Sequence, residues 1–145
     1  MTFRSREGEE NMYSKTAQKV ADLMAAVETT LTGNGRPRKQ PDHDRVEAVT
    51  DHGKRVRPTH VEATSFSLPG ALKADARLLG YGANVRRFAA YAILDETYEY
   101  SGEGESALYT LDNVMLDTRQ LVRLIRAARK NIELQLKAGA KSISV

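Results

Sequence analysis

The chain has 145 residues, of which 41% are hydrophobic and 28% charged, with a net charge of +3. This length fits one globular domain, and the balance of residues argues against a disordered chain. Because the sequence has no cysteine, disulfides and thiolate metal sites are excluded. The opening sequence MTFRSREGEENMYS has no apolar leader, and no apolar run approaches the roughly 20 residues of a membrane span. We therefore expect a cytoplasmic protein with no membrane partner.

Composition divides the chain into two polar ends and one domain. We expect a mobile polar arm over residues 1–13, a single domain over residues 14–138 and a loose tail over residues 139–145. The domain begins with a helix near Ser14, because apolar residues recur there every three or four positions as far as Leu31. The glycines that follow Leu31 end this helix.

The middle of the chain predicts a hairpin and then a strand that turns into a helix. Two short segments, residues 46–50 and 54–58, flank the turn sequence Asp-His-Gly, which is typical of a β-hairpin. Alternating apolar and polar residues after His60 predict a strand. Ser67 is the expected N-cap of the helix that follows, and Gly80 is its expected end.

Two further helices complete the prediction. The helix after Ser67 is expected to bury Leu78 and Leu79, and Asn84 is expected to cap a third helix. Asp117, with Gln120 three residues later, predicts the start of the last helix, whose apolar stripe then continues to its end. The sequence as a whole predicts an α+β fold with three to four helices packed on a small antiparallel sheet.

Basic residues on the last helix form the clearest charge pattern. Arg119, Arg123, Arg126 and Lys130 are 4, 3 and 4 residues apart, so they share the face opposite the apolar stripe. Guanidinium groups at this spacing can hold a phosphate through paired hydrogen bonds. Only Glu133 offers an acidic partner on the same helix. The pattern predicts an anion-binding face, with a solvated helix surface as the alternative.

Residues elsewhere could complete a nucleotide site. The turn that contains Ser67 and Gly70 opens a helix, whose free N–H groups and dipole attract anions, although an ordinary capped helix start has the same residues. Asn113 could hydrogen-bond a base or a ribose, and Tyr109 or Phe66 could stack on a base.

Catalytic and metal-binding patterns are weak. The three histidines, His43, His52 and His60, lie in the loop and hairpin region. With nearby aspartates and serines they could form a triad or a metal site, but neither the H-E-x-x-H pattern nor a nucleophile elbow or P-loop is present. We therefore expect binding rather than catalysis, with no catalytic residue, metal or cofactor.

A basic segment over residues 36–57 supports an alternative function. Its side chains could track the phosphates of DNA or RNA, as an accessory protein would, although no stacking aromatics are interleaved with them. The candidate residues are Arg36, Arg38, Lys39, Lys54, Arg55 and Arg57. A solvated loop is the simpler interpretation, and a structural virion or assembly protein is a third possibility.

Two stretches of the sequence carry a family resemblance. GKRVRPTHVEATSFSLPGALKAD and LDNVMLDTRQLVRLIRAA, within residues 53–75 and 108–128, resemble a family of small uncharacterised actinobacterial and phage proteins. In that family an apolar-aromatic turn leads into a Gly-Ala-Leu helix, and a Trp-Asn-Asp-like segment precedes the last helix. Here Thr110-Leu111-Asp112-Asn113 replaces that segment, and serine replaces a cysteine often found in the turn. The resemblance implies these local elements and no particular activity.

In size and plan the chain also resembles small, arginine-rich α+β phage proteins that sequester cyclic nucleotide or ADP-ribose-type immune signals without cleaving them. This resemblance implies a homo-oligomer with pockets built from arginines, an asparagine and a stacking aromatic. The leading hypothesis is therefore a non-catalytic binding protein for an anionic nucleotide-type ligand, with phage anti-defence as the setting that the resemblance implies.

Overall fold

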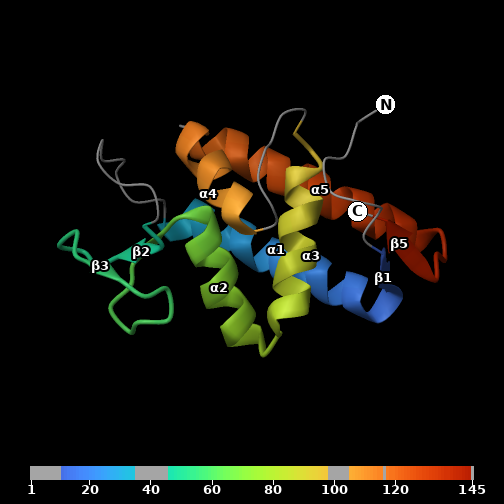
Figure 1. Ribbon diagram of the computed structural model, residues 1–145, viewed down its shortest axis with the longest axis horizontal. Helices are drawn as coiled ribbons and strands as arrows, with labels where there is room; N and C mark the ends of the chain where they lie inside the picture. Colours follow the sequence, from blue (N-terminus) through green and yellow to red (C-terminus); the bar gives the residue numbers. More distant parts are fainter. Residues whose placement is uncertain (1–10, 35–45, 98–104, 116, 145) are drawn as a thin grey trace.

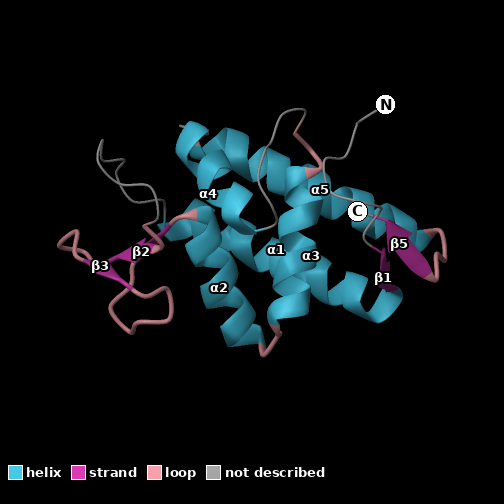
Figure 2. Cartoon of the chain, in the orientation of Figure 1, coloured by secondary structure: helices cyan, strands magenta, loops and turns pink. Residues whose placement is uncertain are grey.

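The computed structural model describes residues 11–34, 46–97, 105–115 and 117–144, and it confirms the predicted α+β fold (Figure 1). The described helices are α1 (Ser14–Asn34), α2 (Leu68–Leu79), α3 (Ala83–Leu94), α4 (Glu105–Val114) and α5 (Thr118–Lys137). The strands are β1 (Asn11–Tyr13), β2 (Ala48–Val49), β3 (Arg55–Val56), β4 (Ser65–Phe66) and β5 (Ser142–Ser144). The helices pack mainly on one another, and the two small antiparallel sheets lie at opposite ends of the helical body (Figure 2).

The two long helices, α1 and α5, form the most extensive contact between elements. Leu31, near the end of α1, and Thr118, at the start of α5, line the same cavity, which shows that the two helices run antiparallel. The predicted stripe of α1 is confirmed: every member is buried, namely Ala17, Val20, Ala21, Met24, Val27 and Leu31. The Asp117 carboxylate accepts a hydrogen bond from the backbone N–H of Arg119, which confirms the predicted N-cap of α5.

Helices α2 and α3 form a hairpin across α1. Ser67 caps α2 as predicted, and Gly80 ends it with a φ of 76°, in the left-handed region that favours glycine. Two other predictions for these helices are wrong. Leu78 and Leu79 are 84% and 41% exposed, because the described part of the chain does not pack over this end of α2. The N-cap of α3 is Gly82, so Asn84 lies inside the first turn.

Helix α4 is an element that the sequence analysis did not predict. Its buried residues Ala107, Leu108 and Leu111 have helical spacing, but the helix is short and follows a Gly-Ser-Glu segment typical of a turn. It packs against α2 and α3 and places Asp112 beside the start of α2. This contact positions the candidate site residues of α4 away from α5's basic face.

The predicted hairpin is confirmed, with the register Ala48↔Val56 and Val49↔Arg55. Strand β4 pairs with the other side of β2, which gives the sheet order β3-β2-β4. The strand expected directly after His60 is shorter than predicted, because only the last two residues of that segment pair. Val61 is 94% exposed in the connecting loop, where it has no sheet face to cover.

The two ends of the domain are tied together. β1 pairs with β5 in the register Asn11↔Ser144, Met12↔Ile143 and Tyr13↔Ser142. The expectation of a loose tail from residue 139 is therefore wrong for these residues, because Ile143 is buried beside Met12 in the core. The prediction of a mobile arm is likewise wrong for residues 11–13, which form β1, and residues 1–10 lie outside the described part. No helix within the described ranges is both long and apolar enough to cross a bilayer.

Candidate functional site

The arginines of α5 gather at one cavity. A hollow of about 500 Å³ lies where the end of α1 meets the start of α5. Its lining residues are Leu31, Thr32, Thr118, Arg119, Val122, Arg123 and Arg126. The helical spacing of the arginines brings their guanidinium groups to the same side of α5, and the antiparallel packing of α1 supplies the opposite wall. The three arginines predicted to bind phosphate therefore share one site.

One wall of this cavity is held by an ion-pair network between α1 and α5. The Arg126 Nε–H donates to Glu28 Oε1 at 2.9 Å, and Arg129 Nη2 lies 3.3 Å from Glu28 Oε2. The Glu28 side chain is only 14% exposed, so solvent screens this network less than a surface pair. Arg126 therefore has a fixed position.

The other two arginines are more open. Arg119 Nε lies 3.5 Å from Asp117 Oδ1, a long contact, and the Arg119 side chain is 86% exposed. Arg123 is exposed and makes no ion pair within the described residues. The hydrogen bond from the Arg119 backbone lowers the pKa of Asp117, which keeps that carboxylate charged at the edge of the cavity. Asp117 pairs with Arg119, and Glu28 pairs with both Arg126 and Arg129, so with Arg123 four arginines stand against two carboxylates and positive charge is in excess.

The turn at the start of α2 does not join this site. Ser67 Oγ accepts from the backbone N–H of Gly70 at 3.1 Å, and Asp112 Oδ1 accepts from that of Leu68 at 2.9 Å. Pro69 has no N–H. The backbone N–H groups in the first turn of α2 are therefore either absent or hydrogen-bonded within the protein. Gly70 admits the backbone carbonyl of Glu47, rather than a ligand, at close approach. The predicted anion site at Ser67 and Gly70 has no free donor.

The predicted base-reading residues are also spread apart. Phe66 lines a second cavity, between α1 and α2. Asn113 lies on α4, and neither residue is among those that line the arginine cavity. The same holds for Tyr109, whose hydroxyl donates to Glu47 Oε2 at 2.8 Å.

Tyr109 belongs to a half-buried cluster with Glu47 and Lys73. The Lys73 ammonium bonds the Glu47 carboxylate and lies 3.4 Å from the Tyr109 hydroxyl. Burial raises the pKa of Glu47, but the hydrogen bonds from Lys73 and Tyr109 outweigh it and leave the pKa lowered. Burial and the nearby Glu47 carboxylate both raise the pKa of Tyr109. For Lys73, burial lowers the pKa, but the hydrogen bond to Glu47 and its charge leave the pKa raised. Lys73 and Tyr109 both stay protonated at neutral pH and Glu47 stays charged, so the cluster links the segment before β2 to α2 and α4.

Glu47→Gln is expected to lower the free energy of unfolding by about 1–2 kcal/mol at pH 7, since it removes a charge that two donors share. The folded pKa lies below the unfolded value, so this stabilisation is present above the unfolded pKa and is lost as the pH falls through the folded one. Urea denaturation at about pH 7 and about pH 3 measures the deficit, which should shrink at the lower pH. Tyr109→Phe, which leaves the Glu47–Lys73 pair intact, should show a smaller deficit. An equal Glu47→Gln deficit at both pH values would contradict this account.

The basic hairpin lies apart from the arginine cavity. Lys54, Arg55 and Arg57 are all exposed around β3, at the end of the molecule opposite β1 and β5 (Figure 1). None of them makes an ion pair within the described residues. The remaining candidates for nucleic-acid contact, Arg36, Arg38 and Lys39, lie outside the described part of the chain.

The histidines form no shared site in the described ranges. His52 and His60 are exposed, and His60 Nδ1 accepts a hydrogen bond from the backbone N–H of Glu62 in its own loop. His43 lies outside the described part. Among the described residues, no three His, Cys, Asp or Glu side chains lie close enough together to hold a metal ion.

No family model, curated protein or solved structure matches this chain. The function is therefore inferred from the chain's own residues. Sequence reasoning found the arginines but missed Glu28, which reaches Arg126 across 98 positions, and the Glu47–Lys73–Tyr109 cluster. The sequence signal for this ion pair was a charged residue, Glu28, directly beside the buried Val27 of α1.

Proposed function

We propose that the protein binds a small anionic ligand of nucleotide type, without turning it over, in the cavity between α1 and α5. The observation that carries this proposal is that Arg119, Arg123 and Arg126 line a single cavity of about 500 Å³. Cavities of roughly 300–1,000 Å³ are the usual size for small-molecule sites, so a mononucleotide fits this class.

The charges favour a phosphate group. Arg126 is held by Glu28, whereas Arg119 and Arg123 are exposed, and of these two only Arg119 has an ion-pair partner in the described part of the chain, the long contact to Asp117. A phosphate accepts paired hydrogen bonds from guanidinium groups, and such charge-assisted bonds are stronger than neutral ones. The ligand would thus be held by the two exposed arginines and oriented by Arg126, which Glu28 holds in place.

The rest of the lining favours binding over chemistry. Leu31 and Val122 offer an apolar wall for a sugar or a base, and Thr32 and Thr118 offer hydroxyl groups. The lining residues include no group that titrates near neutral pH and could serve as a general acid or base. The cavity lining does not include the residues predicted to read a base or bind at the turn, namely Tyr109, Asn113, Phe66, Ser67 and Gly70. The ligand is therefore recognised mainly through its phosphate.

Isothermal titration with mono-, di- and cyclic nucleotides tests the site. Replacing Arg119 and Arg123 together by glutamate is expected to weaken binding about 100-fold or more, because two charge-assisted contacts become repulsive. The matched control is Lys15→Glu with Lys141→Glu, which makes the same change in net charge at exposed positions outside the cavity. An equal loss in both double variants, each checked as folded by circular dichroism, would show a general charge effect and overturn the proposal.

A second candidate function is nucleic-acid binding at the hairpin, which the exposure of Lys54, Arg55 and Arg57 favours. Reversing these charges would then weaken DNA or RNA binding uniformly across sequences, with a shallower dependence on salt. Small nucleotides would not compete for this surface. The two functions are separable, because the arginine-cavity variant would leave this binding unchanged.

The homo-oligomer and the role in phage anti-defence remain predictions from the resemblance. Sedimentation equilibrium tests the first. Cyclic nucleotides and ADP-ribose-type molecules are the probes that the second suggests. A structural or assembly role would instead produce large subunit contacts and no nucleotide binding.

A further inference from the structure

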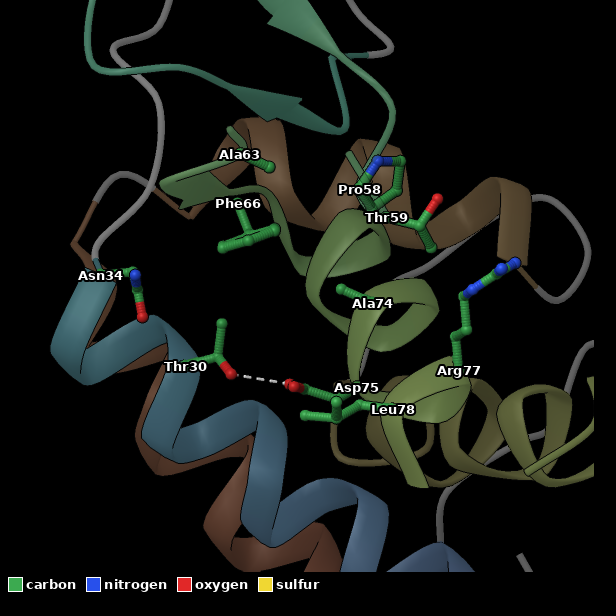
Figure 3. Close-up of a pocket in the computed structure, with 10 residues that line it drawn as sticks. All are labelled: Thr30, Asn34, Pro58, Thr59, Ala63, Phe66, Ala74, Asp75, Arg77 and Leu78. Atoms are coloured by element: carbon green, nitrogen blue, oxygen red, sulfur yellow. Dashed lines mark hydrogen bonds between the residues drawn. The ribbon is translucent and has the colours of Figure 1, made fainter. Parts of the chain in front are cut away.

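A second cavity, of about 550 Å³, lies between α1, α2 and the loop before β4 (Figure 3). It is on a different face of α1 from the arginine cavity, and the two share no lining residue. The described residues that line it are Thr30, Asn34, Pro58, Thr59, Ala63, Phe66, Ala74, Asp75, Arg77 and Leu78.

A buried carboxylate stands at the centre of this lining. Asp75 is only 7% exposed, and its Oδ2 accepts a hydrogen bond from the Thr30 hydroxyl at 2.8 Å. Neither a second donor nor an ion pair to Asp75 occurs among the described residues. A buried carboxylate with one neutral partner is costly, because burial removes the water that would stabilise its charge. Burial accordingly raises the pKa of Asp75, and the Thr30 bond offsets this only in part.

The nearest cation in the lining does not neutralise this carboxylate. Figure 3 shows the Arg77 side chain pointing away from Asp75, toward the far side of α2. The remaining lining is mixed: five residues are apolar, and Thr30, Asn34 and Thr59 carry neutral polar groups. Phe66 is buried in the wall, and Leu78 is exposed. A buried carboxylate beside apolar side chains and neutral polar groups is an arrangement that fits an organic cation.

We propose that this cavity binds a small organic cation, one whose primary ammonium pairs with Asp75 and whose apolar body lies against Phe66. The ammonium offers three hydrogen-bond donors, of which Asp75 and the Thr30 hydroxyl accept two. Leu78, 84% exposed at the rim, covers the apolar body of the ligand. This site is independent of the arginine cavity and goes beyond the anion-binding function.

Benzylamine is the probe for this site, and benzyl alcohol is its uncharged counterpart. NMR titration of the full chain is expected to show benzylamine binding with shifts at the residues lining the cavity. In the near-isosteric variant Asp75→Asn, the affinity for benzylamine should fall about tenfold or more, whereas that for benzyl alcohol should stay unchanged. No binding of benzylamine to the wild-type chain, or equal affinity in Asp75→Asn, would overturn the proposal.

Two further variants guard against a trivial result. Leu78→Lys changes an exposed side chain and places a competing ammonium at the rim, so it should leave the fold intact and weaken the binding of benzylamine more than that of benzyl alcohol. Asp51→Asn removes a carboxylate from the exposed hairpin turn and should change neither affinity. Weaker benzylamine binding in Asp51→Asn, to the same extent as in Asp75→Asn, would show a general charge effect and would also overturn the proposal.

Discussion

Replacing Gly70 by alanine is expected to lower the free energy of unfolding by about 3 kcal/mol or more. A methyl group at this position would overlap the backbone carbonyl oxygen of Glu47. That carbonyl cannot move aside at low cost, because the backbone N–H of Ser67 bonds it at 3.0 Å and the Ser67 hydroxyl at 3.3 Å. Alanine would therefore separate α2 from the segment leading into β2, although its intrinsic helix propensity is better than that of glycine.

Gly33→Ala provides the matched control. Gly33 is exposed near the end of α1, and an added methyl group would meet no atom within 4 Å. Here the gain in helix propensity is unopposed, so stability should stay the same or rise by up to about 1 kcal/mol. Urea denaturation of both variants makes the comparison. A small loss in Gly70→Ala, similar to the change in Gly33→Ala, would contradict the close approach of α2 to Glu47.

Asp112→Ala is expected to cost about 2–3 kcal/mol, the second-largest effect. Asp112 is 6% exposed, and its carboxylate bonds the backbone N–H of Leu68, the first residue of α2. Alanine would leave this buried donor without a partner, which costs more than the loss of an exposed hydrogen bond. Asp112→Asn keeps an oxygen acceptor and should recover part of the loss.

The exposed cap of α5 provides the comparison for Asp112. Asp117 bonds the Arg119 N–H at the surface, so Asp117→Ala should cost only about 1 kcal/mol. Thermal and urea unfolding would measure both variants. If Asp117→Ala proved the more damaging, the link between α4 and α2 would not have the role described here.

Helices that local sequence determines were predictable. The stripe of α1, the Ser67 cap with Gly80 as the end of α2, and the Asp117 cap of α5 all depend on residues within a few positions of one another. The wrong predictions concern features that distant residues determine. Leu78 and Leu79 continue an apolar pattern that local spacing cannot distinguish from a core, and their exposure depends on which helices lie alongside α2.

Contacts between distant residues were not predictable. Asn11 pairs with Ser144, and Glu47 meets Tyr109 across 62 positions. Within one sequence nothing links such partners, because their meeting depends on how whole elements pack. The candidate site follows the same division. Helical spacing placed the three arginines on one face, whereas the cavity itself exists only because α1 packs antiparallel to α5.

A thermal-shift screen of the full chain against mono-, di- and cyclic nucleotides, with chromatography of the recovered ligand, tests the central claim most directly. Binding to the folded state at 100 times the dissociation constant contributes about 2.7 kcal/mol, which would raise the melting temperature by several degrees. The proposal predicts such a shift with the ligand recovered unchanged, and its loss when Arg119 and Arg123 are reversed in charge. The absence of a shift with every nucleotide, or the recovery of an altered ligand, would contradict it.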